Sequence, residues 1–438
     1  MRYSGITERD RQEMLRVIGV ESVEDLYRSV PQAVRMNRPL QVDGPLPEAS
    51  LMRRLEEMKG PAPRVSLVGG GLYNHYVPAP VDSLAARSEW VTSYTPYQPE
   101  LAQGTLVMYY EFQTYVCMLT GQELANGGMY DASTAMAEAV MMARRIRKKA
   151  TDLYVSDAVH PEYRRVLDTY LQFQDDVKLH VLPVDPETGR TIVDIPTDVQ
   201  RDALAIIVQS PNFFGVIEEG TAVADDAFVI SVCTEAQSMA LLNPLRADIA
   251  VGDMQSFGIP VQLGGPTAGF MAAKKEHVRQ IPGRLVGKTK DRLGREAYCI
   301  TLATREQFIR REKATSNICT SSGLMCLRAS IYLSLLGKEG LQDVARQSAR
   351  AAHAFCEALE EVGLKRVHDG GFFNEFVVDA SARPQLWEAL RASGFVMGIP
   401  LAQWWPDREH QYLVALTELH YPQIRDLIQE VKRHAHDS

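Results

Sequence analysis

The sequence lacks most of the short motifs that mark a metal or nucleophile site. Its six cysteines include no Cys-x-x-Cys pair, its ten histidines form no His-Glu-x-x-His, and no Gly-x-Ser-x-Gly occurs. These absences argue against a zinc ribbon, a thioredoxin-like redox site, a clustered metal site and a serine nucleophile elbow. Six scattered cysteines in 438 residues form no disulfide framework, so we expect reduced thiols, most of them buried.

A basic charge excess and long apolar runs are also absent. The chain has 47 Lys and Arg against 55 Asp and Glu, and the formal net charge of -8 argues against nucleic acid as a partner. No run of about 18 apolar residues predicts a membrane span. Residues 1–15 are polar and charged, without the apolar segment of a secretory signal. We therefore expect a cytoplasmic protein that binds neither nucleic acid nor membrane.

The glycine-rich stretch at residues 69–71 does not match a dinucleotide-binding loop. Such a loop has the spacing Gly-x-Gly-x-x-Gly and opens a helix. Here the glycines continue into LYNHYVPAP, in which two prolines oppose a helix start. We expect a tight turn instead.

Three regions differ in their pattern. Residues 1–63 predict a helical arm, with Thr7 as the N-cap of its first helix and several prolines after it. Residues 64–330 predict a large α/β domain, because runs that are apolar on both faces alternate with helical segments, as in a mostly parallel sheet. Residues 331–438 predict a small C-terminal α+β domain. The expected strands of the large sheet are residues 153–156, 178–184, 204–209, 228–233, 248–251 and 268–272.

Two long helices are expected before this sheet. Residues 101–121 are amphipathic and end at Gly121, and residues 132–150 are rich in Ala and Met and end in a cationic turn. Residues 276–330 are strongly basic and predict loops. In a sheet of this kind, ligands bind at the carboxyl ends of the strands.

The loop YTPYQPE at residues 94–100 combines a stiff backbone with polar groups. Two prolines restrict it, while Tyr94, Tyr97, Gln98 and Glu100 offer donors and acceptors. Such a loop is either a site held by a scaffold or a packing element.

Two further features also have two readings. In RREKATSN, residues 310–317, the side chains of Lys313, Thr315 and Asn317 either bind a phosphate or carboxylate or belong to a solvated charged face. His160 follows a predicted strand, and its ring either stacks on a flat cofactor or packs in the ordinary way.

Several stretches together resemble the P-protein family of the glycine cleavage system, glycine dehydrogenase (decarboxylating). In chain order they are EWVTSYTPYQPELAQGTLVMYYEFQTYVCMLTGQELANGGMYDASTAMAEAV, VQSPNFFGVIEE, GDMQSFGIPVQLGGPTAGF, IPGRLVGKTKDRLGREAY and TREQFIRREKATSNICTSSGL. YTPYQPE and REKATSNICT are highly specific, and the matches cover most of the chain.

The resemblance implies a fold and a subunit type. The fold is that of pyridoxal-phosphate (PLP)-dependent transferases of fold type I, similar to aspartate aminotransferase. Family members either join two homologous halves in one chain or divide them between two subunits. With 438 residues, this chain resembles subunit 1, the first half of the two-subunit type, and the resemblance implies two copies of each subunit.

Two departures from the family pattern concern the cofactor. Where the PLP-binding half has an aspartate that pairs with the pyridine nitrogen, this chain has VISVCTEAQ, with Thr234 near the aspartate position. Where that half has His-Lys-Thr, this chain has Gln255-Ser256-Phe257, and Ser256 at the lysine position has no amine to form a Schiff base. The resemblance therefore implies that this chain has no covalent cofactor and no catalytic residue of its own.

In this family, glycine condenses with PLP on the partner subunit, carbon dioxide leaves, and the aminomethyl group passes to the lipoyl arm of the H-protein. We expect this chain to form the heterodimer face and to donate loop residues to the partner's site. The residues expected to face the partner's substrate or cofactor are Tyr94, Tyr97, Gln98, Glu100, Lys313, Thr315, Asn317, His75 and Asn74.

Two alternatives remain open from the sequence. In the first alternative, the chain is a self-sufficient PLP enzyme that uses Lys274 or Lys275, the lysines nearest to Ser256. In the second, it is a purely structural subunit with no residue in any active site.

Overall fold

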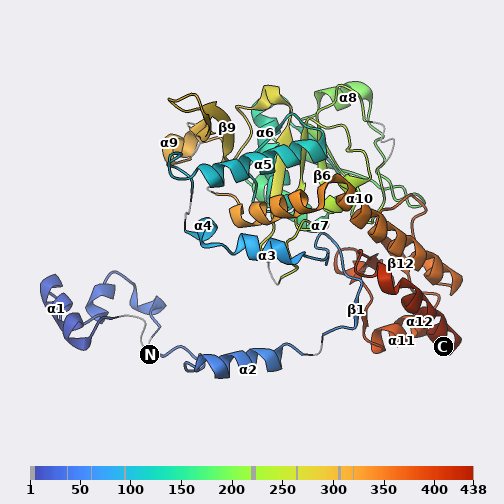
Figure 1. The fold of residues 1–438 in the computed structure, drawn as a ribbon, viewed down its shortest axis with the longest axis horizontal. Helices are drawn as coiled ribbons and strands as arrows, with labels where there is room; N and C mark the ends of the chain where they lie inside the picture. Colours follow the sequence, from blue (N-terminus) through green and yellow to red (C-terminus); the bar gives the residue numbers. More distant parts are fainter. Residues whose placement is uncertain are drawn as a thin grey trace. The chain divides into compact units, whose positions relative to one another are not determined.

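The computed structural model describes residues 5–36, 38–60, 62–92, 95–218, 223–262, 265–303, 307–318 and 320–437. The chain divides into two compact units, Met1–Ala62 and Pro63–Ser438. Figure 1 shows their helices and strands.

The first unit is helical, as the sequence predicts. Its helix α1, Glu8–Ile18, begins at Thr7, whose hydroxyl accepts a hydrogen bond from the Asp10 backbone at 3.2 Å. The Asp10 carboxylate accepts from the Thr7 backbone at 2.8 Å and completes a capping box. The predicted N-cap is confirmed. The other elements are α2 (Glu48–Met58) and the short 3₁₀ helices η1 (Glu24–Tyr27) and η2 (Gln32–Val34).

The second unit is built on a seven-stranded sheet with the strand order β2-β8-β7-β6-β5-β3-β4. Strands β3 to β7 are parallel, while β8 runs antiparallel to β7 and β2 antiparallel to β8. Every predicted strand is present, and the expected mostly parallel sheet is confirmed. The strands are β2 (Leu124–Ala125), β3 (Asp152–Ser156), β4 (Lys178–Leu182), β5 (Ala205–Gln209), β6 (Val229–Cys233), β7 (Ile249–Asp253) and β8 (Gly269–Ala273).

Helices cover both faces of this sheet. On one face, Ala135 and Ala139 of α6 (Ala132–Ile146) pack against Ile230 and Ile249 of the sheet, together with α7 (Pro161–Leu171). Small side chains let α6 approach the strands closely. On the other face, α5 (Gln103–Thr120) lies beside α10 (Gly323–Glu361) over β8, as Figure 1 shows. The buried core therefore has two layers around one sheet.

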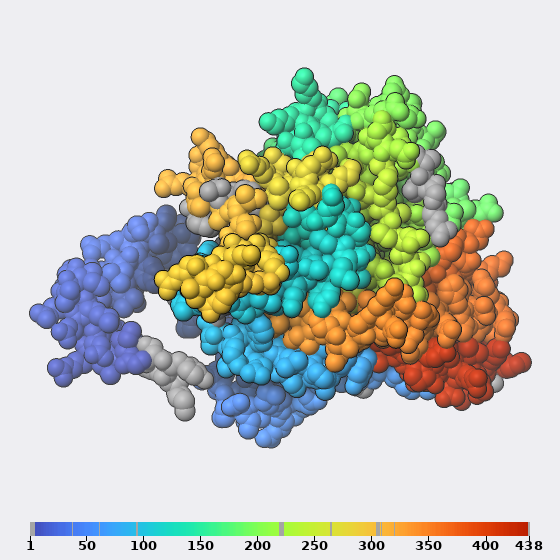
Figure 2. All heavy atoms as spheres, turned by 45° about the horizontal axis from the view of Figure 1, so that its top comes forward, coloured from blue at the N-terminus to red at the C-terminus, as the bar shows by residue number. Residues whose placement is uncertain are grey.

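A hairpin lies where the sequence predicted loops. Strands β9 (Leu285–Lys290) and β10 (Glu296–Thr301) pair antiparallel, and the Asp291 carboxylate closes the turn by accepting from the backbones of Leu293 and Arg295. In Figure 2 the hairpin stands out from the surface beside α5. Basic side chains on its exposed half gave this segment the composition of a loop.

The C-terminal part of the second unit contains a smaller sheet with helices, and a separate domain at residues 331–438 stays a prediction. This antiparallel sheet has the order β11-β12-β15-β14, with strands β11 (Lys365–Arg366), β12 (Glu375–Asp379), β14 (Ile399–Pro400) and β15 (Gln411–Ala415). Helix α10 enters this part of the unit, and at Gly337 it leaves helical geometry with φ 60° and ψ -171°. Near the start of the unit, β1 (Val65–Ser66) pairs with β13 (Phe395–Val396), so this segment belongs with the small sheet rather than the large one.

The remaining elements connect these parts. They are α3 (Ala79–Ala85), α4 (Ser88–Val91), α8 (Thr197–Asp202), α9 (Gln307–Arg310), α11 (Pro384–Ala392), α12 (Ile424–Asp437), η3 (Ala236–Ala240), η4 (Lys275–His277), η6 (Arg311–Lys313), η7 (Leu401–Gln403) and η8 (Tyr421–Gln423).

Candidate functional site

A cavity of about 570 Å³ opens at the carboxyl ends of the parallel strands, where ligands bind in folds of this type. We name it the edge cavity. The end of β7, the start of α6, the glycine turn and the segment between β3 and α7 form its wall. Its lining includes Gly70, Gly71, Tyr130, Asp131, Ser133, His160, Tyr163, Asp253, Thr267 and Ser322.

Asp131 is the N-cap of α6 and lines the edge cavity. Its carboxylate accepts hydrogen bonds from the Thr134 backbone at 2.7 Å and from the Ser133 hydroxyl at 2.7 Å. The N-terminus of a helix is an anion site because its first N–H groups lack partners inside the helix. Here the chain supplies that anion itself.

A second carboxylate, Asp253, ends β7 on the same wall. Burial raises its pKa to about 6, although the backbone N–H groups of Gln255 and Ala268 donate to one of its oxygens at 2.9 and 3.3 Å. The charge of Asp131 raises this pKa further. Two acidic groups therefore face the cavity, and no lysine or arginine is among its described lining residues.

His160 lines the cavity, and its ring packs against side chains of the chain itself, in agreement with the packing alternative. The ring stacks on Tyr163 with centroids 4.3 Å apart, and its Nε2 lies 2.8 Å from the Gly70 carbonyl oxygen. Burial lowers its pKa to about 4, so the imidazole is neutral near pH 7. His160 therefore brings no positive charge that would balance the two aspartates.

The turn after β7 carries the predicted departure from the PLP-binding pattern. Ser256 is buried, and among the described residues its hydroxyl has no hydrogen-bond partner. The neighbouring Gln255 bonds through both side-chain atoms to the backbone of Tyr73, at 2.8 and 3.0 Å. Residues 253–259 contain no lysine, so no amine of this turn enters the cavity.

The end of β6 is engaged in a buried ionic network. Glu235 lies 3.1 Å from Nε2 of His75, and Glu418 lies 2.6 Å from Nδ1 of the same ring. Burial alone would lower the pKa of His75, but the two carboxylates outweigh it and raise that pKa to about 10. The imidazolium is therefore held inside the chain at neutral pH. Thr234 lies next to Glu235 and is also buried.

The glycine turn belongs to the same network. The Glu375 carboxylate accepts from the Gly70 backbone at 2.7 Å and from the Tyr73 hydroxyl at 2.9 Å. A Cβ on Gly69 would lie 2.3 Å from a Glu375 oxygen, so only glycine allows this approach. Burial raises the pKa of Glu375 to about 8. The predicted turn is present, and it holds a side chain of the small sheet.

Pyridoxal phosphate does not fit this set of residues. A phosphate needs free N–H groups or cations, while the α6 terminus is capped by Asp131 and the cavity is acidic. A covalent linkage needs a lysine, and the turn at residues 253–259 has none.

The lysines of the self-sufficient alternative lie at the other edge of the sheet. Lys274 forms an ion pair with Asp248, and the second Asp248 oxygen accepts from the backbone of Val229, the first residue of β6. Because β8 is antiparallel, the residues after it lie at the amino ends of β6 and β7. Lys275 is in this region too, bonded through its backbone to Glu123. Neither lysine lies near the edge cavity.

The YTPYQPE loop lies at the surface. Tyr97, Gln98 and Glu100 are exposed, and the Arg284 guanidinium lies 5.6 Å from the centre of the Tyr97 ring. These side chains are accessible to a partner. Tyr94 lies outside the described residues.

Thr315 and Asn317 line a different hollow, of about 480 Å³, beside the C-terminal half of α6. Its other lining residues include Arg144, Arg145 and Lys148. From Asp131 to Arg145, the helix rises about 20 Å, so this hollow is distant from the edge cavity. Lys313 is exposed in η6 and does not line it.

Asn74 and His75 differ in the exposure of their side chains. The Asn74 side chain is exposed, and its carbonyl accepts from the Thr417 hydroxyl at 2.8 Å. The His75 side chain is 3% exposed, with both nitrogens bonded inside the chain. The expectation that His75 faces a partner does not agree with this geometry, because its ring is enclosed and fully engaged.

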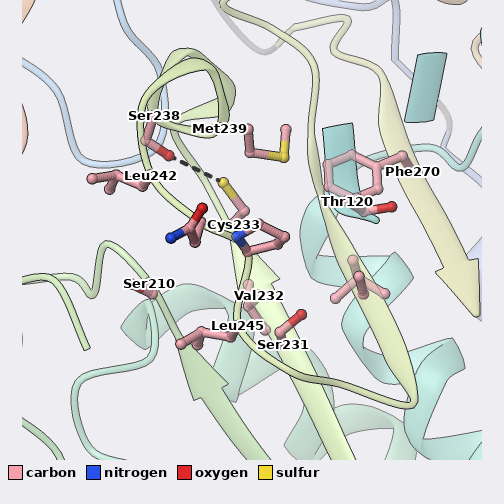
Figure 3. Close-up of a pocket in the computed structure, with 14 residues that line it drawn as sticks. Thr120, Ser210, Ser231, Val232, Cys233, Ser238, Met239, Leu242, Leu245 and Phe270 are labelled. Carbon is pink, nitrogen blue, oxygen red and sulfur yellow. Dashed lines mark hydrogen bonds between the residues drawn. The ribbon is translucent and has the colours of Figure 1, made fainter. Parts of the chain in front are cut away.

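Figure 3 shows a smaller cavity between β6 and α5, around Cys233, Ser238 and Phe270. Its volume is about 40 Å³, which admits water but no cofactor. Burial raises the pKa of the Cys233 thiol to about 12, so this sulfur is not a thiolate near pH 7.

Across the described ranges, no group of three or more His, Cys, Asp or Glu side chains is arranged to hold a metal ion. Of the helices that the structure describes, none combines the length and the hydropathy that crossing a bilayer requires.

Comparison with known proteins places the chain beside one family. The family model of the glycine cleavage system P-protein matches residues 1–431. A protein of Anaeromyxobacter dehalogenans named probable glycine dehydrogenase (decarboxylating) subunit 1 is 44% identical over 440 residues, covering 98% of each chain. A protein of the same name from Geobacillus kaustophilus is 43% identical over 432 residues, covering 95% of each chain.

Solved structures agree with the fold. An inhibitor-bound glycine decarboxylase (P-protein) of the glycine cleavage system superimposes with a TM-score of 0.84 at 39% identity, covering 99% of this chain and all of the other. The glutamate decarboxylase of Lactobacillus brevis, with a TM-score of 0.64 at 13% identity over 94% of this chain and 97% of its own, shares the fold alone. The expected PLP-transferase fold type I is confirmed.

Proposed function

Because the chain belongs to the P-protein family of the glycine cleavage system, we propose that it is the subunit of a two-subunit glycine decarboxylase that carries no PLP of its own. A homologous partner subunit holds PLP, glycine loses its carboxylate there, and the aminomethyl group passes to the lipoyl arm of the H-protein. One observation carries the proposal for this chain: its edge cavity presents Asp131 and Asp253 and, among the described lining residues, no cation.

The electrostatics of the edge cavity support this division of labour. A phosphate beside Asp131 would meet a carboxylate at the helix end that normally attracts anions. A pyridine nitrogen near the end of β6 would meet Glu235, which already pairs with the His75 imidazolium. Binding of the phosphate at Asp131, or of the pyridine nitrogen at Glu235, would break a hydrogen bond within the chain.

The exposed loop is the part of this chain that we propose to act in the partner's site. Tyr97, Gln98 and Glu100 present a phenol, an amide and a carboxylate on a backbone stiffened by two prolines. Such side chains orient a substrate and exclude water. The proposal also includes Tyr94, Asn74, Lys313, Thr315 and Asn317, and it assigns no general acid or base to the chain.

Co-purification with the PLP-binding subunit, followed by absorption spectra of each subunit and of the complex, tests the proposal. We expect this chain alone to stay colourless after incubation with PLP and to carry no PLP label after borohydride, and the complex to be yellow and active in glycine decarboxylation. Stoichiometric PLP on this chain alone, fixed by borohydride to a lysine, would reject the proposal.

A purely structural role is the second candidate, favoured by the internally satisfied network around His75. Tyr97→Phe and Gln98→Ala in the reconstituted complex separate the two, with Gln403→Ala at another exposed glutamine as control. We expect the loop variants to lower turnover and the control to leave it unchanged. Unchanged turnover in all three, with intact assembly, supports the structural role.

We also propose a cytoplasmic location, as expected from the sequence.

A further inference from the structure

A second cavity of about 570 Å³ lies beside the YTPYQPE loop, between α4, α5 and the start of α10. We name it the arginine hollow. Trp90, Met108 and Leu327 give it apolar walls, and Thr105, Tyr109 and Ser321 give it hydroxyl groups. It adjoins the edge cavity, because Pro266 and Ser322 line both.

The charge of this hollow is opposite to that of the edge cavity. Arg284 lines it and is 5% exposed, whereas no Asp or Glu is among its described lining residues. A guanidinium stays protonated in proteins, so the hollow contains a fixed positive charge in a water-poor setting.

The position of Arg284 is fixed by the fold. Its carbonyl accepts from the Gly127 backbone at 2.8 Å, and it directly precedes β9. Its guanidinium lies 5.6 Å from the centre of the exposed Tyr97 ring. The cation therefore lies at the base of the loop that is expected to meet the partner.

The neighbouring hydroxyls are arranged as donors. Ser321 donates to the Tyr109 oxygen at 3.2 Å, which leaves the Tyr109 proton to point elsewhere. Burial raises the pKa of Tyr109, so this phenol keeps its proton. Helix α10 begins here with no side-chain cap at Ser322, and the positive end of its dipole adds to the same field.

We propose that the arginine hollow binds an oxyanion, a carboxylate or a phosphate, presented by the PLP-binding partner, with Arg284 as its cation and Tyr109 as a hydroxyl donor. This inference rests on the proposed function, since the oxyanion belongs either to glycine or to the cofactor that the partner holds. Guanidinium and phenol groups match the oxygen geometry of both anions.

Three variants test the hollow. Arg284→Gln removes the charge, Arg284→Lys keeps it but loses the planar fork, and Arg295→Gln removes an exposed arginine from the same hairpin region as a control. In the reconstituted complex we measure KM for glycine and the dissociation constant of PLP by spectral titration. With the full chain alone, we measure the rise in unfolding temperature with inorganic phosphate.

We expect Arg284→Gln to raise either KM for glycine or the dissociation constant of PLP roughly 10- to 100-fold, the effect of losing a hydrogen bond to a charged group. Arg284→Lys should raise the same constant less. A rise confined to KM for glycine identifies the carboxylate, and a rise confined to the PLP dissociation constant identifies the phosphate. Arg295→Gln should match wild type. If Arg284→Gln prevents folding, Arg284→Lys carries the test.

Two outcomes separate this inference from the proposed function. Unchanged constants in the complex, together with a phosphate response that does not depend on Arg284, overturn the oxyanion site. A raised constant for Arg284→Gln, together with unchanged constants for the Tyr97 and Gln98 variants, supports the oxyanion site and rejects the loop's role in the partner's site.

Discussion

Nδ1 of His75 lies 2.6 Å from Oε2 of Glu418, although 343 residues separate the two in sequence. The other ring nitrogen reaches Glu235 at 3.1 Å, so one imidazolium joins the loop after β1, the end of β6 and the segment after β15. The ring thus ties the large sheet to the small one through charge rather than through apolar packing.

Replacing His75 with glutamine should destabilise the chain by about 3–5 kcal/mol, because two buried carboxylates would lose their cation. Chemical denaturation measures the change. His180→Gln, which removes a half-exposed histidine paired with Asp152, is the control and should cost at most about 1 kcal/mol. Equal effects of the two variants would contradict the importance of the buried network.

The stability of the chain should fall as the pH rises from about 6.5 to about 10. Unfolded histidine releases its proton near pH 6.5, whereas His75 in the folded chain keeps it until about pH 10. The stabilisation is therefore complete below pH 6.5 and is lost through this window. Glu375, with its pKa raised to about 8, acts in the same direction from pH 4.5 to 8.

Unfolding temperatures measured across this pH range check the prediction. His75→Gln should flatten the curve between pH 8 and pH 10, while His180→Gln should follow wild type. A curve for His75→Gln as steep as that of wild type would mean that other groups cause the alkaline loss.

Restoring a lysine should not restore PLP binding. Ser256→Lys supplies an amine to the turn after β7, but the Asp131 carboxylate still accepts from the Thr134 N–H at the start of α6. We expect no visible colour and no borohydride-fixed label in this variant. Asp131→Ser keeps an N-cap and removes the charge, so the double variant should bind PLP better than the lysine variant alone. Tight binding by Ser256→Lys alone would show that charge is not the barrier.

Lys274→Met should leave the PLP content and turnover of the complex unchanged. Its ion pair with Asp248 lies at the amino edge of the sheet, and Lys274 is 42% exposed, so we expect a stability loss of about 1 kcal/mol. Loss of PLP from the complex, with assembly intact, would revive the self-sufficient alternative.

The interior strands of the sheet could be predicted from the sequence because they are covered on both sides. Residues 204–209 were expected as a strand, and β5 contains Ile206, Ile207 and Val208, all buried. The β9–β10 hairpin was not predicted because Lys288 and Lys290 face solvent, and a half-exposed basic strand has the composition of a loop.

The acidic character of the edge cavity was missed for two reasons. Asp131 had a readable signal, since Asp131 and Thr134 form a capping box directly before a predicted helix. Asp253 had none, because its place beside Asp131 depends on how strands pair. The partners of His75 were equally hidden, since they lie 160 and 343 residues away.

Gly337 divides α10 into two parts, one packed on each sheet, and a rotation at this residue would move one part relative to the other. The part of α10 before it packs with Tyr332 in the core of the large sheet, and the part after it packs with Phe355 under the small one. The 24 residues from 338 to 361 span about 36 Å, so a 10° rotation at this glycine would displace the far end by about 6 Å. The two backbone angles of Gly337 therefore set the direction in which α10 continues from the large sheet to the small one.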